Sequence, residues 1–135
     1  DVMEIQQIAK ENNLDIPVIQ SISNSNSKHL IWFSKKLIEI ININNLQKII
    51  LLGAAFKENT DDTRYSPTFE IYNILENAGE NVVIYDDSLT LDDKYNQIFS
   101  FEDNALYVEM YPLGNKVENQ IAELNDTLYF RFWDS

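Results

Sequence analysis

Cysteine is absent from this chain, and histidine occurs only once, at position 29. The missing cysteine excludes a disulfide framework and a cysteine nucleophile within these 135 residues. A lone histidine in an amphipathic helical pattern is more typical of a helix surface than of a metal ligand or a general base. Glycine is scarce as well, with three residues, and no second glycine follows Gly53 closely, as a dinucleotide-binding G-x-G-x-x-G loop requires.

Positive charge is also in short supply. Ten Lys and Arg residues face 22 Asp and Glu residues, which gives a formal net charge of −12. Such a balance argues against nucleic acid or an anionic membrane as a partner. No apolar run approaches the length of a membrane span, and no signal peptide is recognisable, so we expect a cytoplasmic protein. The sequence starts at Asp1 rather than at Met, and we therefore expect a fragment of a longer protein.

The chain has enough apolar residues, 44%, for one folded domain with an appendage. Its first part has helical periodicity. Residues 1–10 form a short amphipathic pattern, and Asp15 with Pro17 marks a new helix start. The polar stretch 21–27 favours a turn between helices over a ligand-binding loop. Residues 28–43 then predict a longer helix that is apolar over much of its circumference.

From residue 46 onward, short apolar runs alternate with helical patterns. We expect strands over 48–53, 81–85, 105–109 and 127–132, and helices over 67–78 and 117–124. The region 86–100 is mixed, with a short helix and an edge strand expected there. Strands that alternate with helices predict a parallel sheet with right-handed crossovers. The predicted fold is therefore a three-layer α/β/α Rossmann-like domain over residues 46–135, preceded by a helical segment over residues 1–45.

The loop between the first strand and the first helix of this α/β part carries the main motif. After Gly53 the chain reads AAFKENTDDTRYSP, so Lys57 and Arg64 lie between a strand end and a helix start. Ser66 and Pro67 fit the N-cap and first helical position. Anionic ligands bind at such helix N-termini in open α/β sheets, because free backbone N–H groups and the helix dipole point there.

This stretch resembles the signature that opens the C-terminal, nucleotide-sugar-binding domain of the UDP-glucose/GDP-mannose dehydrogenases. The family pattern is G-x-A-F-K, a short spacer, T-D-D-x-R-x-S-P and a helix. The matching residues are Gly53, Ala55, Phe56, Lys57, Thr60, Asp61, Asp62, Arg64, Ser66 and Pro67. The resemblance is tight over residues 48–86 and looser elsewhere.

The resemblance implies roles for individual residues. It implies that Phe56 and Lys57 contact the nucleotide sugar, that Arg64 reaches towards NAD across a domain interface, and that Arg131 contacts substrate. Arg131 matches the Arg of the family's Asp-x-Arg pattern, although Tyr129 stands at the Asp position. Asp1 matches an acidic residue that follows the family's catalytic cysteine and helps to handle water and protons.

Each assignment has an alternative reading. Lys57 could be a solvated loop lysine, and Arg64 could form an ion pair with Asp61 or Asp62. The two adjacent carboxylates beside these cations favour a salt-bridged turn over a metal site. Asp86 follows a strand, where a dinucleotide-binding domain has its ribose-binding acid, but without the glycine fingerprint a turn residue is favoured. The aromatic residues around Arg131 favour core packing over stacking on a base.

As a whole, the resemblance implies the substrate-binding portion of an NAD-dependent nucleotide-sugar 6-dehydrogenase, which makes uronic acids for polysaccharide synthesis. A UDP-sugar is the expected substrate, and NAD would be bound mainly by an N-terminal domain outside this chain. Without that domain and the cysteine, this fragment is expected to be inactive. We also expect a homodimer through the N-terminal helices. The alternatives are a stand-alone nucleotide-sugar-binding module and a purely structural dimerisation piece.

Overall fold

The computed structural model describes residues 16–54 and 66–134. The short helix expected over residues 1–10 and most of the motif loop lie outside these residues. Five parallel strands form one sheet in the order β3-β2-β1-β4-β5. The strands are β1 (Lys48–Leu52), β2 (Val82–Tyr85), β3 (Gln97–Ile98), β4 (Ala105–Glu109) and β5 (Leu128–Arg131).

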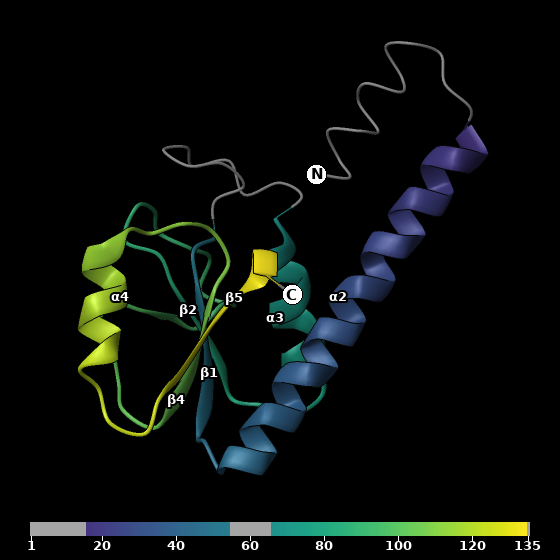
Figure 1. Ribbon diagram of the computed structural model, residues 1–135. Coiled ribbons are helices and arrows are strands. Elements are labelled where there is room, and N and C mark those ends of the chain that lie inside the picture. The colour runs from purple at the N-terminus through teal and green to yellow at the C-terminus, as the bar shows by residue number, and fades with distance from the viewer. Residues whose placement is uncertain (1–15, 55–65, 135) are drawn as a thin grey trace.

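Helices cover both faces of this sheet, which gives the expected three layers (Figure 1). Helices α2 (Ile16–Asn44) and α3 (Pro67–Asn77) lie on one face, and α4 (Asn115–Ala122) lies on the other. A short 3₁₀ turn, η1 (Phe132–Asp134), follows β5. The three-layer α/β/α Rossmann-like architecture predicted from the sequence is thus confirmed.

The alternation of side chains along β1 explains the two cores. Ile49 and Leu51 point into a cluster with α2 and α3, whereas Ile50 and Leu52 point into a cluster with Ile121 of α4. All four side chains are fully buried. A strand that is apolar at every position is what a central parallel strand between two helical layers requires.

The turn expected over residues 21–27 is not present. Helix α2 runs without interruption through this polar stretch, over 29 residues. Serine and asparagine lower helix propensity by only a few tenths of a kcal/mol each, and the stretch contains neither glycine nor proline. Once helix has formed on both sides, extending it through such residues costs little free energy, and this outweighs their local preference for a turn.

The second half of α2 belongs to the same core as the sheet. Leu30, Phe33, Leu37 and Ile41 are buried in the cluster with β1 and α3, while Ile31 and Trp32 remain about half exposed. The apolar circumference read from the sequence is therefore covered on one side only. The division at residue 45 remains a prediction.

Other element boundaries differ little from those expected. The mixed region 86–100 contains the short edge strand β3 and no helix. The Gln97 side chain holds this region as a loop. Its Nε2 donates to the Asp86 and Leu89 carbonyls, and its Oε1 accepts from the Leu91 N–H. Phe132, expected in the last strand, begins η1. Among the described residues, no helix is both long and apolar enough to cross a membrane.

Candidate functional site

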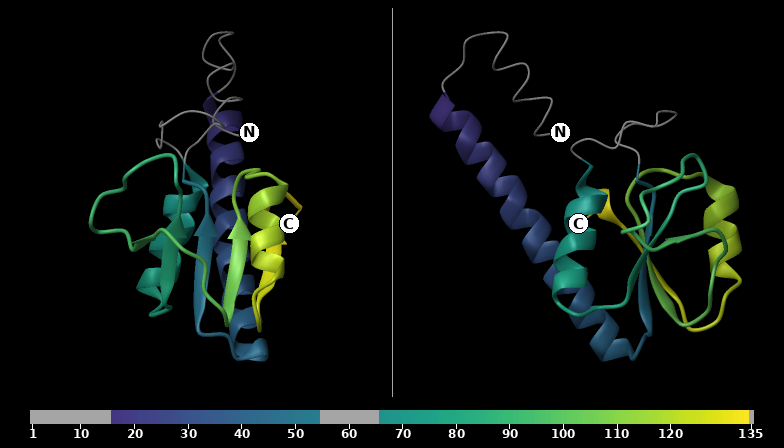
Figure 2. Two further views of the ribbon diagram at one scale, coloured as in Figure 1. Left: turned by 90° about the vertical axis from the view of Figure 1, so that its left-hand side faces the viewer. Right: turned by 180° about the vertical axis from the view of Figure 1, so that it is seen from behind.

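The sheet order places a topological switch point between β1 and β4. After β1 the chain crosses through α3 to β2, and after β4 it crosses through α4 on the opposite face to β5. The two crossovers therefore diverge to opposite faces of the sheet, with α3 on one face and α4 on the other (Figure 2). In open α/β sheets, ligands bind in the crevice that such divergence creates. The motif loop leaves from this point, at Gly53.

The start of the motif loop is held by buried hydrogen bonds. The Asp86 carboxylate accepts from the Ala54 N–H at 2.8 Å and, through its other oxygen, from the N–H and hydroxyl of Ser88. The Thr68 hydroxyl donates to the Gly53 carbonyl at 2.7 Å. Asp86 is thus the turn residue that the sequence favours, and it also fixes the chain 32 positions away.

Gly53 itself has a φ of 97°, a region that side-chain-bearing residues rarely adopt. A Cβ added there would lie 3.2 Å from Cδ2 of Tyr111, a residue in the loop after β4. The glycine therefore permits both the turn and the close approach of the tyrosine ring.

Tyr111 also contacts the other end of the motif loop. Its hydroxyl lies 3.2 Å from the Ser66 hydroxyl, and burial raises the pKa of the Tyr111 phenol. Ser66 is the N-cap of α3, as predicted, and accepts from the Thr68 N–H. One side chain from the β4–α4 loop thus touches both points from which residues 55–65 depart.

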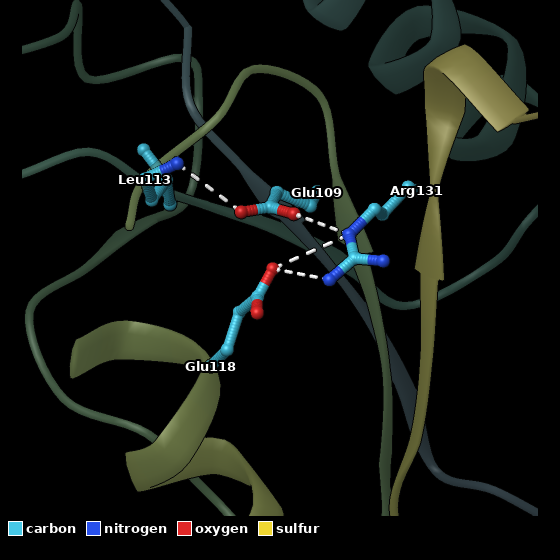
Figure 3. A network of polar contacts seen from close by, with 4 residues as sticks. All are labelled: Glu109, Leu113, Glu118 and Arg131. Carbon is cyan, nitrogen blue, oxygen red and sulfur yellow. Dashed lines mark hydrogen bonds and ion pairs between the residues drawn. The ribbon is translucent and has the colours of Figure 1, made fainter. Parts of the chain in front are cut away.

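At the carboxyl ends of β4 and β5, next to the switch point, lies an ion-pair network (Figure 3). Arg131 ends β5 in register with Glu109, which ends β4. Arg131 Nη2 donates to Glu118 Oε1 at 2.7 Å, and its Nε lies 3.4 Å from Glu109 Oε2. The other Glu109 oxygen accepts from the Leu113 N–H at 3.1 Å. Glu109 is 1% exposed, so the guanidinium supplies the counter-charge that a buried carboxylate needs.

Beside the network lies a buried hydroxyl without a well-formed hydrogen bond. The Tyr129 hydroxyl is inaccessible to solvent, and among the described residues it makes only a side-chain contact with Glu109 that does not reach normal hydrogen-bond geometry. Burial, together with the charge of Glu109, raises the pKa of this phenol far above its usual value, so it stays neutral. In contrast, the buried Tyr107 hydroxyl donates to the Glu102 carbonyl and accepts from the Glu102 N–H, both at 2.7 Å.

This contrast predicts opposite effects of the same substitution. Tyr129→Phe should raise the free energy of unfolding by about 1 kcal/mol, because a buried hydroxyl without a well-formed hydrogen bond is removed. Tyr107→Phe should lower it by about 1–3 kcal/mol, because the Glu102 N–H and carbonyl lose their partner. Urea unfolding of both variants measures the two changes, and a destabilised Tyr129→Phe protein would mean that the hydroxyl is paired.

The predicted site residues fare differently. Arg131 lies at the carboxyl edge, beside the switch point, whereas Asp1, Phe56, Lys57, Arg64, Asp61 and Asp62 lie outside the described residues. Three residues of the site were missed by sequence reasoning: Tyr111, Glu109 and Glu118. Glu109 had a signal, since it ends a strand beside the motif strand. Tyr111 and Glu118 had none.

Ala54 and Asp86 are not arranged as in a dinucleotide-binding loop. In a dinucleotide-binding loop, backbone N–H groups approach the pyrophosphate and the acid after the second strand binds ribose. Here the Ala54 N–H donates to Asp86, and both oxygens of that acid are engaged within the protein. Among residues 16–54 and 66–134, no cluster of His, Cys, Asp or Glu is arranged to hold a metal ion.

The fold and its topological switch point define a Rossmann-like α/β domain. Residues 50–123, more than half of the chain, match the UDP binding domain of the UDP-glucose/GDP-mannose dehydrogenase family. The chain belongs to this family.

Similar proteins agree with this assignment. The chain is 31% identical over 86 residues to the UDP-glucose 6-dehydrogenase TuaD of Bacillus subtilis, and 31% identical over 86 residues to a GDP-mannose 6-dehydrogenase of Pseudomonas aeruginosa. Each match covers 64% of this chain and 19% of the relative. The chain therefore spans about a fifth of the length of these curated relatives.

Solved structures show the same fold. The match to a ternary complex of GDP-mannose dehydrogenase from Pseudomonas aeruginosa covers 98% of this chain and 35% of the dehydrogenase chain, with a TM-score of 0.59 and 20% identity. The UDP-N-acetyl-mannosamine dehydrogenase Cap5O from S. aureus matches 87% and 34%, with a TM-score of 0.60 and 21% identity. Both are dehydrogenases with a Rossmann-like fold.

Proposed function

We propose that this chain is the nucleotide-sugar-binding portion of an NAD-dependent 6-dehydrogenase, which oxidises the primary alcohol of a UDP- or GDP-sugar to a carboxylate for polysaccharide synthesis. The observation that carries the proposal is that the family match spans the topological switch point, from β1 through the motif loop to α4. A UDP-sugar is the favoured ligand, and the cytoplasm, where such precursors are made, is the favoured location.

In this proposal, Phe56 and Lys57 contact the nucleotide sugar, and Lys57 lies near its diphosphate. The fixed geometry on both sides of the motif loop supports this role: Asp86 and Thr68 hold the chain at Gly53–Ala54, and Tyr111 contacts Ser66. Arg131 contacts a further part of the same ligand. Arg64 reaches towards NAD, and Asp1 assists proton transfer near a cysteine of the longer protein.

NAD would be bound mainly outside this chain. The engagement of Ala54 and Asp86 with each other supports this, because it removes the two groups that a dinucleotide needs. The chain also contains no cysteine, so the 135 residues alone should not oxidise the sugar nucleotide.

The direct test is an activity assay of the longest protein in which this chain occurs. With UDP-glucose and NAD, two molecules of NAD should be reduced for each sugar molecule oxidised, because oxidation of a primary alcohol to a carboxylate releases two hydrides. UDP-N-acetyl-mannosamine and GDP-mannose serve as competing substrates. If no nucleotide sugar supports NAD reduction, while ligand-free protein is folded by circular dichroism, the proposed activity is wrong.

The N-terminal helices would form a homodimer interface. Exposed apolar side chains on α2 support this: Ile31 is 44% exposed, Trp32 48% and Ile43 81%. Exposed apolar side chains are a common feature of interaction surfaces. Sedimentation should give a dimer that Trp32→Glu converts to a monomer. A monomeric wild-type chain at all accessible concentrations would contradict the proposal.

A further inference from the structure

Tyr111 lies where three segments of the chain meet: the end of β1, the start of α3 and the loop after β4. Its ring packs closely over Gly53, where an added Cβ would lie 3.2 Å from Cδ2 of the tyrosine. Its hydroxyl lies 3.2 Å from the hydroxyl of Ser66, the N-cap of α3. A side chain from a third segment therefore joins the two described ends of the motif loop.

The backbone on either side of Tyr111 is itself held in place. The Met110 N–H donates to the Leu52 carbonyl at 2.9 Å, one step beyond the paired residues of β1 and β4. The Leu113 N–H donates to Oε1 of Glu109 at 3.1 Å, and this bond closes the turn that carries Tyr111. The Tyr111 side chain thus projects from a backbone that is anchored on both sides.

The Tyr111 hydroxyl joins a set of buried hydrogen bonds at the start of α3. Ser66 Oγ accepts from the Thr68 N–H at 3.3 Å, and the Thr68 hydroxyl donates to the Gly53 carbonyl at 2.7 Å. Both Ser66 and Thr68 are buried. Burial raises the pKa of Tyr111, so the phenol is neutral near pH 7 and keeps its proton for a hydrogen bond. Buried polar networks whose members are paired are rigid.

Rigidity at this place matters for ligand affinity. A binding segment that already has its bound geometry loses less conformational freedom when the ligand arrives. Without the Tyr111 hydroxyl, Ser66 and the first turn of α3 would sample more arrangements. Part of the binding free energy would then be used to restore the original one. A residue that does not touch the ligand can therefore raise its affinity.

We propose that Tyr111 is a positioning residue for nucleotide-sugar binding, in which its hydroxyl fixes Ser66 at the start of α3 and its ring fixes the chain at Gly53. The inference rests on the proposed function and adds to it a residue that acts through Ser66 rather than by contact with the ligand.

Tyr111→Phe removes the hydroxyl and retains the ring. In calorimetric titration of the longer protein with UDP-glucose, the dissociation constant should rise about fivefold, the equivalent of one hydrogen bond. The melting temperature should change by no more than about 5 °C, because Ser66 still caps α3. Tyr85→Phe is the matched control and should bind as the wild type does. Tyr85 is also half-buried and ends β2, and among the described residues its hydroxyl makes no hydrogen bond.

A double-mutant cycle with Ser66→Ala separates positioning from direct contact. If Tyr111 acts through Ser66, its hydroxyl has no further effect once the serine hydroxyl is absent. The double variant should then bind UDP-glucose as weakly as Ser66→Ala alone. If Tyr111 contacts the ligand itself, the two fold-changes should multiply. All titrations are run at a temperature at which thermal melts show every variant to be folded.

Steady-state kinetics of the longer protein give a second readout. Tyr111→Phe should raise the Michaelis constant for UDP-glucose about fivefold and leave kcat within about twofold of the wild type. Partial unfolding would have the opposite pattern, because it lowers the amount of active enzyme and leaves the Michaelis constant unchanged.

The outcomes distinguish this inference from the proposed function. An unchanged dissociation constant in Tyr111→Phe, or fold-changes that multiply with those of Ser66→Ala, would overturn the positioning role and leave the proposed function standing. A folded wild-type protein that binds no nucleotide sugar would overturn both.

Discussion

Replacing Asp86 with alanine is expected to lower the free energy of unfolding by about 2–4 kcal/mol, the largest stability effect at the carboxyl edge. The carboxylate is 6% exposed and accepts from the Ala54 N–H, the Ser88 N–H and the Ser88 hydroxyl. Alanine would leave the buried Ala54 N–H without a partner, and a desolvated donor of that kind is costly. Urea unfolding followed by circular dichroism measures the change.

The neighbouring acid provides the control. Asp87 is exposed, so Asp87→Ala removes the same charge with an expected change within about 0.5 kcal/mol. Asp86→Asn should fall between the two, because an amide oxygen replaces only one of the two accepting oxygens. Equal stability of the Asp86→Ala and Asp87→Ala proteins would show that the contact between Asp86 and Ala54 does not hold the start of the motif loop.

Lys57→Ala is expected to have the largest effect on ligand binding. If Lys57 contacts the diphosphate, its loss removes a charge-assisted contact and should weaken nucleotide-sugar binding roughly 10- to 100-fold. In the longer protein, the Michaelis constant for the nucleotide sugar should rise far more than that for NAD. Steady-state kinetics with each substrate varied in turn measures the two constants.

Arg64→Ala is the matched comparison for Lys57→Ala. It removes a cation from the same loop, but it should raise the Michaelis constant for NAD more than that for the nucleotide sugar. Partial unfolding would lower the amount of active enzyme without separating the two substrates, and thermal melts check for it. An unchanged nucleotide-sugar constant in Lys57→Ala would mean that the lysine is a solvated loop residue.

Local signals in the sequence were sufficient for the framework of this fold. Ser66 and Pro67 predicted the start of α3, and Ser66 does accept from the Thr68 N–H. Gly79 follows the end of that helix, and its φ of 83° is the conformation typical of a helix-ending glycine. These predictions succeeded because capping depends on neighbours in the chain.

Contacts between distant segments could not be predicted in this way. The pairing of Ser66 with Tyr111 spans 45 residues, and the Arg131 network requires the register of β4 with β5. A single sequence carries no information on either. The continuity of α2 was missed for a related reason, since cooperative helix formation outweighs the turn preference of a short polar stretch.

The central claim is that a nucleotide sugar binds at the carboxyl edge of this sheet, around the switch point between β1 and β4. Titrating the ¹⁵N-labelled chain with UDP-glucose, and recording amide chemical shifts, tests it most directly. We predict saturable shifts at Gly53, Ala54, Ser66, Tyr111 and Arg131, with little change at Gly79 and Asn104 on the opposite edge. Shifts confined to the opposite edge, or none at saturating ligand, would contradict the account.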